Sequence, residues 1–246
     1  MQSDIAIVLF VILGLVFGSF GNVLIARLPT GEKITGRSHC PLCGVHLRII
    51  DLIPVVSYLI LQGHCRSCRK RISIRYPLVE AAGALLFILA YFLVPTKIPL
   101  AILLAAILWL LFIIAVIDAS TKEIPDILTI PLIAICALFA FLQKDFSIVA
   151  PALGAALFAL QWGISSGKWI GSGDILVAIG IGFLLATPGH VILWLLLSYI
   201  VGGVVAATLL LLKKTHRQAH IAFAPFLVTG ALITLIVGDR LLVILP

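Results

Sequence analysis

The segment "WIGSGDILVAIGIGFLL", Trp169–Leu185, places one carboxylate at the edge of a stretch that suits a lipid environment. Eleven residues without any charge follow Asp174. An ionisable group at membrane depth is costly, and the groups found there are by default functional hypotheses. The segment therefore predicts a membrane helix that begins at a functional carboxylate.

The rest of the chain is equally apolar. Its 246 residues are 62% hydrophobic and 11% charged, whereas soluble domains carry roughly 25% charged residues. A helix needs about 20 mostly apolar residues to cross a bilayer. Eight such runs are present, of which the sixth is short: Ile5–Ile25, Leu78–Val94, Leu100–Ile117, Ile127–Leu142, Ile148–Ile164, Ile175–Ala186, Val191–Leu212 and Ile221–Val237. We predict an all-α polytopic membrane protein with about eight transmembrane helices, the first of which is a permanent span rather than a cleaved signal peptide.

The basic residues are distributed unevenly between the predicted loops. Lysine and arginine in short loops mark the cytoplasmic side of a membrane protein. Nine of the seventeen basic residues lie between the first two runs: Arg27, Lys33, Arg37, Arg48, Arg66, Arg69, Lys70, Arg71 and Arg75. With that loop inside, alternation of the spans also places five more inside: Lys122, Lys168, Lys213, Lys214 and Arg217. Only Lys97, Lys144 and Arg240 fall on the outer side. The orientation of the spans therefore accounts for the excess of basic residues, and we expect no nucleic-acid partner.

The one sizeable polar segment, residues 27–76, contains "CPLCG" at Cys40 and Cys43 and "CRSC" at Cys65 and Cys68. Two CxxC pairs about twenty residues apart are typical of a zinc site. Each short turn presents two thiolates to one tetrahedral ion, and four cysteines close its coordination shell, so we expect a structural zinc. The alternative is two disulfides, which the reducing cytoplasm disfavours.

Four carboxylates fall at the predicted cytoplasmic ends of spans: Asp118, Glu123, Asp126 and Asp174. Asp126 follows a proline and is also typical of a first-turn helix residue stabilised by the helix dipole. Asp174 also fits a plain helix N-cap. Asp118 ends a helix, where the dipole disfavours negative charge, and pairing with Lys122 is its simplest structural explanation.

If Asp118 and Asp174 approach each other, one of them keeps a proton, because two carboxylates sharing a site are not both ionised cheaply. The ionised carboxylate can take a proton from water while the other polarises a carbonyl. This arrangement would hydrolyse a peptide bond without a metal or a covalent intermediate. Gly171 and Gly173 would let a substrate backbone come close to the loop.

Glu80 opens the second run just inside the basic loop. The helix dipole explains a negative charge at that position. It also lies close enough to the cysteine loop in sequence to contribute to the chemistry of that region.

These motifs together resemble the bacterial prepilin peptidases, which are GxGD-type intramembrane aspartic proteases that also act as N-methyltransferases. The similarity covers nearly the whole chain and rests on "GSFGNVLIARLP", the cysteine segment continuing to "RYPLVE", "IDASTKEIPD", "GSGD" and "IAFAPFLVTG". The chain departs from the family pattern at Gly21, where leucine is usual, and at Ala222 and Ala224, where proline and glycine are common.

The resemblance implies an inner-membrane enzyme that cleaves the basic leader of type IV prepilins or pseudopilins at the cytoplasmic face. It would then methylate the new N-terminal residue with S-adenosylmethionine, whose binding residues the motifs do not identify. By motif position, Asp118 and Asp174 are the catalytic pair, and Asp126 has a supporting role. Cys40, Cys43, Cys65 and Cys68 are the zinc ligands.

The implied division is a methyltransferase-associated region at residues 1–95, including the cysteine loop, and a peptidase domain at residues 96–246. Two alternatives stay open: a peptidase without methyl transfer, and a transporter or channel with a zinc-stabilised cytoplasmic cap. Transporters favour charges near the bilayer midplane and repeated halves, whereas these carboxylates lie at one surface. The sequence leaves the oligomeric state undefined.

Overall fold

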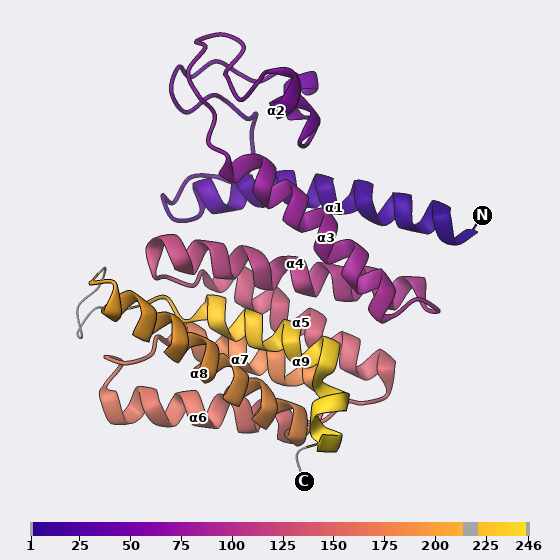
Figure 1. The fold of residues 1–246 in the computed structure, drawn as a ribbon, viewed down its shortest axis with the longest axis vertical. Coiled ribbons are helices and arrows are strands. Elements are labelled where there is room, and N and C mark those ends of the chain that lie inside the picture. The colour runs from indigo at the N-terminus through magenta and orange to yellow at the C-terminus, as the bar shows by residue number, and fades with distance from the viewer. Residues whose placement is uncertain (1, 214–220, 245–246) are drawn as a thin grey trace. The chain divides into compact units, whose positions relative to one another are not determined.

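The computed structural model describes residues 2–213 and 221–244. Their regular structure is helical, apart from two isolated β-bridges in the cysteine loop, so the predicted all-α class is confirmed (Figure 1). Lys214 and Arg217, two of the basic residues assigned to the cytoplasmic side, lie outside the described residues. The chain divides into two compact units, Met1–Trp109 and Leu110–Pro246.

Six helices of the described residues are long and apolar enough to cross a membrane. They are α1 (Gln2–Arg27), α3 (Arg75–Leu93), α4 (Ile98–Thr121), α5 (Asp126–Gln143), α8 (Pro188–Leu211) and α9 (Ala224–Ile244). Two further apolar helices are shorter: α6 (Val149–Ser165) has 17 residues and α7 (Ser172–Leu185) has 14. At 1.5 Å per residue α7 extends about 21 Å, less than the roughly 30 Å of a hydrocarbon core. The eight predicted runs therefore all form helices, with the sixth run short as its sequence indicates.

In the first unit, α1 and α3 pack closely because glycines line their contact. A Cβ atom at Gly14 or Gly18 of α1 would collide with the α3 backbone, and one at Gly83 would collide with α1. Small residues of this kind let membrane helices approach each other where apolar burial gives little driving force. The cysteine loop connects these two helices and includes the short helices η1 (Ile49–Leu52) and α2 (Val56–Ile60).

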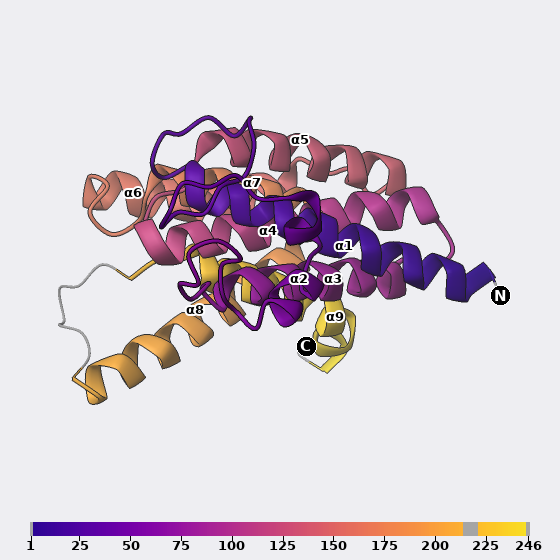
Figure 2. The same ribbon diagram turned by 90° about the horizontal axis from the view of Figure 1, so that it is seen from above.

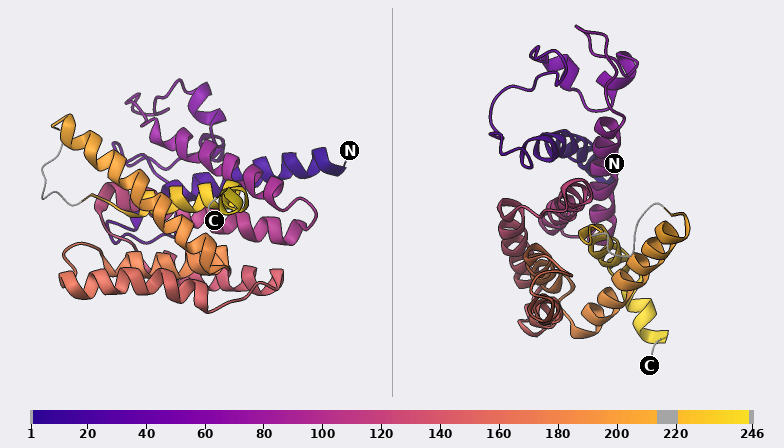
Figure 3. Two further views of the ribbon diagram at one scale, coloured as in Figure 1. Left: turned by 60° about the horizontal axis from the view of Figure 1, so that its bottom comes forward. Right: turned by 90° about the vertical axis from the view of Figure 1, so that its left-hand side faces the viewer.

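In the second unit, α7 packs against both α5 and α6 (Figure 2). The helix α8 packs against α9 (Figure 3). A buried hydrogen bond of 2.9 Å, which the indole Nε1 of Trp194 donates to the carbonyl oxygen of Leu227, joins these two helices. The packing holds the N-terminal ends of α7 and α9 within one unit, and both ends carry site residues.

The contact between α6 and α7 depends on Gly182, where a Cβ atom would collide with the backbone of Pro151. We expect Gly182→Ala to destabilise the protein by about 1–3 kcal/mol, the usual effect of overpacking, and thus to lower the midpoint of thermal unfolding in detergent. The matched control is Gly163→Ala in α6, where a Cβ meets nothing within 4 Å. That change is expected to be neutral or to stabilise by about 0.5–1 kcal/mol. Equal midpoints for the two variants would contradict this description of the contact.

Candidate functional site

Asp118 lies near the C-terminal end of α4 and is 5% exposed. Its Oδ2 atom accepts a hydrogen bond of 2.9 Å from the backbone N–H of Ala224, the first residue of α9. Among the described residues no ion pair joins it to Lys122, so the pairing considered from the sequence is not observed. The carboxylate is instead held at the N-terminus of a distant helix, where the dipole stabilises negative charge. Because the donor is a backbone N–H, the alanine that departs from the family pattern at position 224 can still supply it.

Asp174 lies in the first turn of α7 and is 7% exposed. Its Oδ2 atom accepts a hydrogen bond of 3.1 Å from the backbone N–H of Gly171. The N-cap position considered for Asp174 from the sequence is held by Gly171 instead, and Asp174 lies three residues further on, where its side chain accepts from the N-cap backbone. This contact uses only one oxygen of the carboxylate. The other oxygen, Oδ1, is buried and has no hydrogen-bond partner. Buried polar atoms are nearly always paired, so an exception of this kind calls for an explanation.

The two carboxylates belong to the same unit and are near enough to interact electrostatically. The loops that carry them also touch: a Cβ atom at Gly173 would lie 2.7 Å from Cβ of Ile124, in the segment that follows Asp118. Gly173 therefore allows close approach of another part of this chain, whereas the sequence suggested close approach of a substrate. Around Gly171 the space is wider, with the nearest atom to such a Cβ at 3.5 Å.

The side chain of Asp126 is exposed at the start of α5. This placement agrees with a first-turn residue stabilised by the helix dipole. Nothing in its position identifies a direct chemical role.

Two aromatic residues, Tyr199 and Phe223, lie near Asp174 and Asp118, and no role was predicted for either from the sequence. Tyr199 of α8 is close enough to interact electrostatically with Asp174. Its ring lies 5.3 Å from that of Phe223, the residue before the Ala224 that bonds to Asp118. The Tyr199 hydroxyl donates a hydrogen bond of 2.9 Å to Oε1 of Gln161. Gln161 and Tyr199 are polar residues on two largely apolar helices, and this is the one signal by which the sequence could have indicated these neighbours of the carboxylates.

A second cluster lies in the first unit, where the sulfur atoms of Cys40, Cys43, Cys65 and Cys68 all lie within 4.8 Å of one another. The two CxxC turns have the same backbone pattern. In each turn the carbonyl oxygen of the first cysteine accepts a hydrogen bond from the backbone N–H of the residue four positions later. The donor is Gly44 in the first turn and Arg69 in the second. Both of these residues have positive φ, 71° and 58°. The two turns thus present their thiols to one centre.

The chemistry of these thiols fits a metal ion. All five cysteines of the chain are free. Backbone N–H groups of Cys68 and Ser67 lower the pKa of Cys65 to about 7. At Cys43 the Val45 backbone favours the thiolate, but desolvation and the neighbouring Cys40 and Cys68 thiols raise the pKa to about 11. Four thiolates this close repel one another and need a cation. A tetrahedral zinc with Zn–S bonds of about 2.3 Å places its sulfurs about 3.8 Å apart, which the cluster accommodates.

Two family models match the chain. The model of the bacterial peptidase A24 N-terminal domain matches residues 12–94, and that of the type IV leader peptidase family matches residues 105–207. The first match contains the cysteine cluster, and the second contains Asp118 and Asp174.

Several curated proteins with the name prepilin leader peptidase/N-methyltransferase are similar to this chain over most of its length. The protein of Aeromonas hydrophila is 33% identical over 261 residues, covering 92% of this chain and 89% of the relative. That of Bacillus subtilis is 31% identical over 237 residues, covering 94% of both chains. That of Pseudomonas aeruginosa is 31% identical over 272 residues, covering 94% of this chain and 90% of the relative. No solved structure shows a significant match.

Proposed function

We propose that this chain, which belongs to the type IV leader peptidase family, cleaves the leader peptide of type IV prepilins or pseudopilins and then methylates the new N-terminal residue. The names of its relatives contain both activities, and the similarity extends over both units of the chain. These names do not favour the transporter hypothesis. The substrates would be membrane-anchored proteins with an apolar helix, which suits an enzyme made of apolar helices.

The observation that carries the peptidase proposal is the environment of Asp118 and Asp174. Each carboxylate is buried and has one oxygen fixed by a backbone N–H. Asp174 keeps a buried oxygen without a partner, which is free to bind a water or a substrate group. Two interacting buried carboxylates share one proton at low cost and can therefore act as acid and base together.

The proposed reaction uses these two groups and water. The ionised carboxylate takes a proton from water, and the oxygen of that water attacks the carbonyl carbon of the scissile bond. The protonated carboxyl donates a hydrogen bond to the carbonyl oxygen and then gives its proton to the leaving amine nitrogen as the C–N bond breaks. Asp126, Gly171 and Gly173 would support the pair by shaping the two loops.

The site and the cysteine loop would face the cytoplasm of a bacterial inner membrane. Nine of seventeen basic residues lie between the first two spans, and such a concentration marks the cytoplasmic side. The four cysteines would hold a structural zinc. Residues 1–95 would serve methyl transfer with S-adenosylmethionine as donor, and residues 96–246 would serve cleavage.

The purified protein and a synthetic prepilin peptide test both activities. The peptide carries a basic leader, a glycine and an apolar helix, and the matched control carries an acidic leader of equal length. Mass spectrometry is expected to show loss of the leader from the basic peptide, followed by a gain of one methyl group only when S-adenosylmethionine is present. Intact peptide would contradict the proposed cleavage, and cleavage without any methyl gain would support the peptidase-only alternative.

A further inference from the structure

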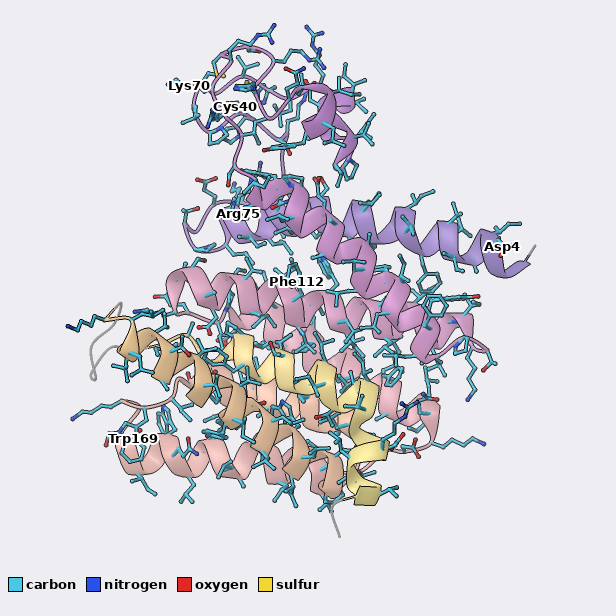
Figure 4. The ribbon with its side chains drawn as sticks, viewed as in Figure 1. Asp4, Cys40, Lys70, Arg75, Phe112 and Trp169 are labelled. Carbon is cyan, nitrogen blue, oxygen red and sulfur yellow. The ribbon has the colours of Figure 1, made fainter. Side chains whose placement is uncertain are left out.

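A cavity of about 720 Å³ lies within the first unit, between the cysteine loop and the adjoining parts of α1 and α3. Pockets for small molecules and cofactors have volumes of about 300–1,000 Å³. Ser19 and Asn22 of α1, Arg75 and Glu80 of α3, and Cys40 and Cys65 of the metal cluster are among its lining residues. In Figure 4 Arg75 lies at the start of α3, where the chain leaves the loop that contains Cys40. Neither Asp118 nor Asp174 is among its lining residues.

Glu80 is an unusual lining residue, because glutamate side chains are rarely buried and this one is only 9% exposed. Its Oε2 atom accepts a hydrogen bond of 2.7 Å from the backbone N–H of Val55. Val55 has φ of 61° and ψ of −48°, a conformation that β-branched residues rarely adopt. Strained residues of this kind persist when the surrounding structure holds them, and they concentrate at functional sites.

Within the described residues no ion pair neutralises Glu80. A buried charge is costly unless it is paired, so the carboxylate fits a site that receives a cationic ligand group. Two other buried polar atoms at the cavity also have no hydrogen-bond partner: Oδ1 of Asn22 and Nε of Arg75. The Asn22 amide is held in place because its Nδ2 donates to the carbonyl oxygen of Tyr76 at 3.0 Å. The cavity thus offers an unpaired acceptor, an unpaired donor and the buried carboxyl group of Glu80.

The cavity lining carries charges of both signs, which suits a ligand that also carries groups of both signs. Six basic side chains and three carboxylates line it, so a purely cationic ligand, such as the basic leader of a substrate, would be repelled by the majority. A purely anionic ligand would meet Glu80. S-adenosylmethionine carries a sulfonium cation, an α-ammonium group and a carboxylate, together with an adenine that the ring of Tyr58 on the same lining could face.

We propose that this cavity binds S-adenosylmethionine, with Glu80 facing the sulfonium, Arg75 binding the carboxylate and Asn22 accepting from an N–H group of the ligand. The inference rests on the proposed function, because it locates the donor site for the proposed methyl transfer. When bound, the donor supplies a methyl carbon: a neutral amine nitrogen, whose extra proton has passed to water, attacks it as the C–S bond breaks and its electron pair goes to sulfur. Glu80 would orient the charged sulfur, and Arg75 would fix the opposite end.

Binding measurements with the full-length protein in detergent test this assignment. Isothermal titration compares S-adenosylmethionine with S-adenosylhomocysteine, which lacks the sulfonium charge but keeps the ammonium and carboxylate groups. We expect Glu80→Gln to weaken binding of S-adenosylmethionine about tenfold or more while changing that of S-adenosylhomocysteine less than about threefold. Glutamine keeps an oxygen that can accept from Val55. Arg75→Gln should weaken both ligands about tenfold, because both carry the carboxylate.

The control is Asp145→Asn, an exposed carboxylate in the other unit, which is expected to bind both ligands like the unaltered protein. Thermal midpoints and metal content verify that each variant is folded, and if Glu80→Gln fails this check, Arg75→Gln decides. Unchanged affinities in folded variants of a protein that still transfers methyl groups would overturn the cavity assignment and leave the proposed function intact. An unaltered protein that cleaves peptide but neither binds the donor nor transfers a methyl group would contradict the methyl-transfer proposal and this inference together.

Discussion

Replacing Asp174 with asparagine is expected to reduce the rate of leader cleavage by about 10³-fold or more, within the range for loss of a general acid or base. The amide can still accept from the backbone N–H of Gly171, so the turn at the start of α7 keeps its hydrogen bond. It cannot take a proton from water at the buried oxygen that has no partner. Asp118→Asn should have an effect of the same order, since its amide oxygen can still accept from Ala224.

Single-turnover cleavage of a prepilin peptide, followed by mass spectrometry, measures these effects. The matched control is Asp145→Asn, which removes a carboxylate from the exposed loop after α5. The double variant should be no slower than either single one by more than a small factor, because the two groups act as a unit. Cleavage at a normal rate in both folded single variants would remove the aspartyl-protease proposal.

Loss of the metal is the second large effect that we expect. Structural zinc sites contribute about 10–16 kcal/mol of binding free energy in small metal-dependent folds, and the described residues of the cysteine loop contain only short helices and isolated bridges. Cys40→Ser should therefore abolish zinc binding and unfold the loop. Metal analysis should find one zinc per chain before the change and close to none after it, and limited proteolysis should then cut within residues 27–76.

Cys136→Ala provides the matched control, because this cysteine is fully buried in α5 and is not a member of the cluster. It should keep one zinc per chain and an intact loop. Absence of zinc from the unaltered protein, with the four loop thiols oxidised in pairs, would favour the disulfide alternative instead.

The helices could be predicted from the sequence because each depends on a local property, a run of apolar residues without charge. The cysteine cluster could be predicted for a related reason. Two residues separate the thiols of each pair, and the backbone of a tight turn brings those thiols together whatever lies between the pairs. The sulfur positions of Cys40, Cys43, Cys65 and Cys68 confirm that the two pairs meet at one centre. That this centre holds zinc stays a prediction.

The surroundings of the carboxylates could not be predicted in this way. The Lys122 pairing considered for Asp118 is four residues away in sequence, whereas the observed partner, Ala224, is 106 residues away. Nothing in the local pattern of either segment encodes that contact. Gly173 is a second example. The sequence suggested that this glycine makes space for a substrate, but the structure shows that it makes space for Ile124, which lies in the motif "IDASTKEIPD".

By itself, the sequence determined the class of the protein, the number of apolar segments, the thiol cluster and the two carboxylates that deserve a test. Only the tertiary structure decided which oxygen of each carboxylate is occupied, and that Glu80, Arg75 and Asn22 line one cavity. The physical reason is the range of the interactions. Apolar burial and turn geometry are set within one or two helical turns, whereas a hydrogen bond between distant segments exists only after the helices have packed.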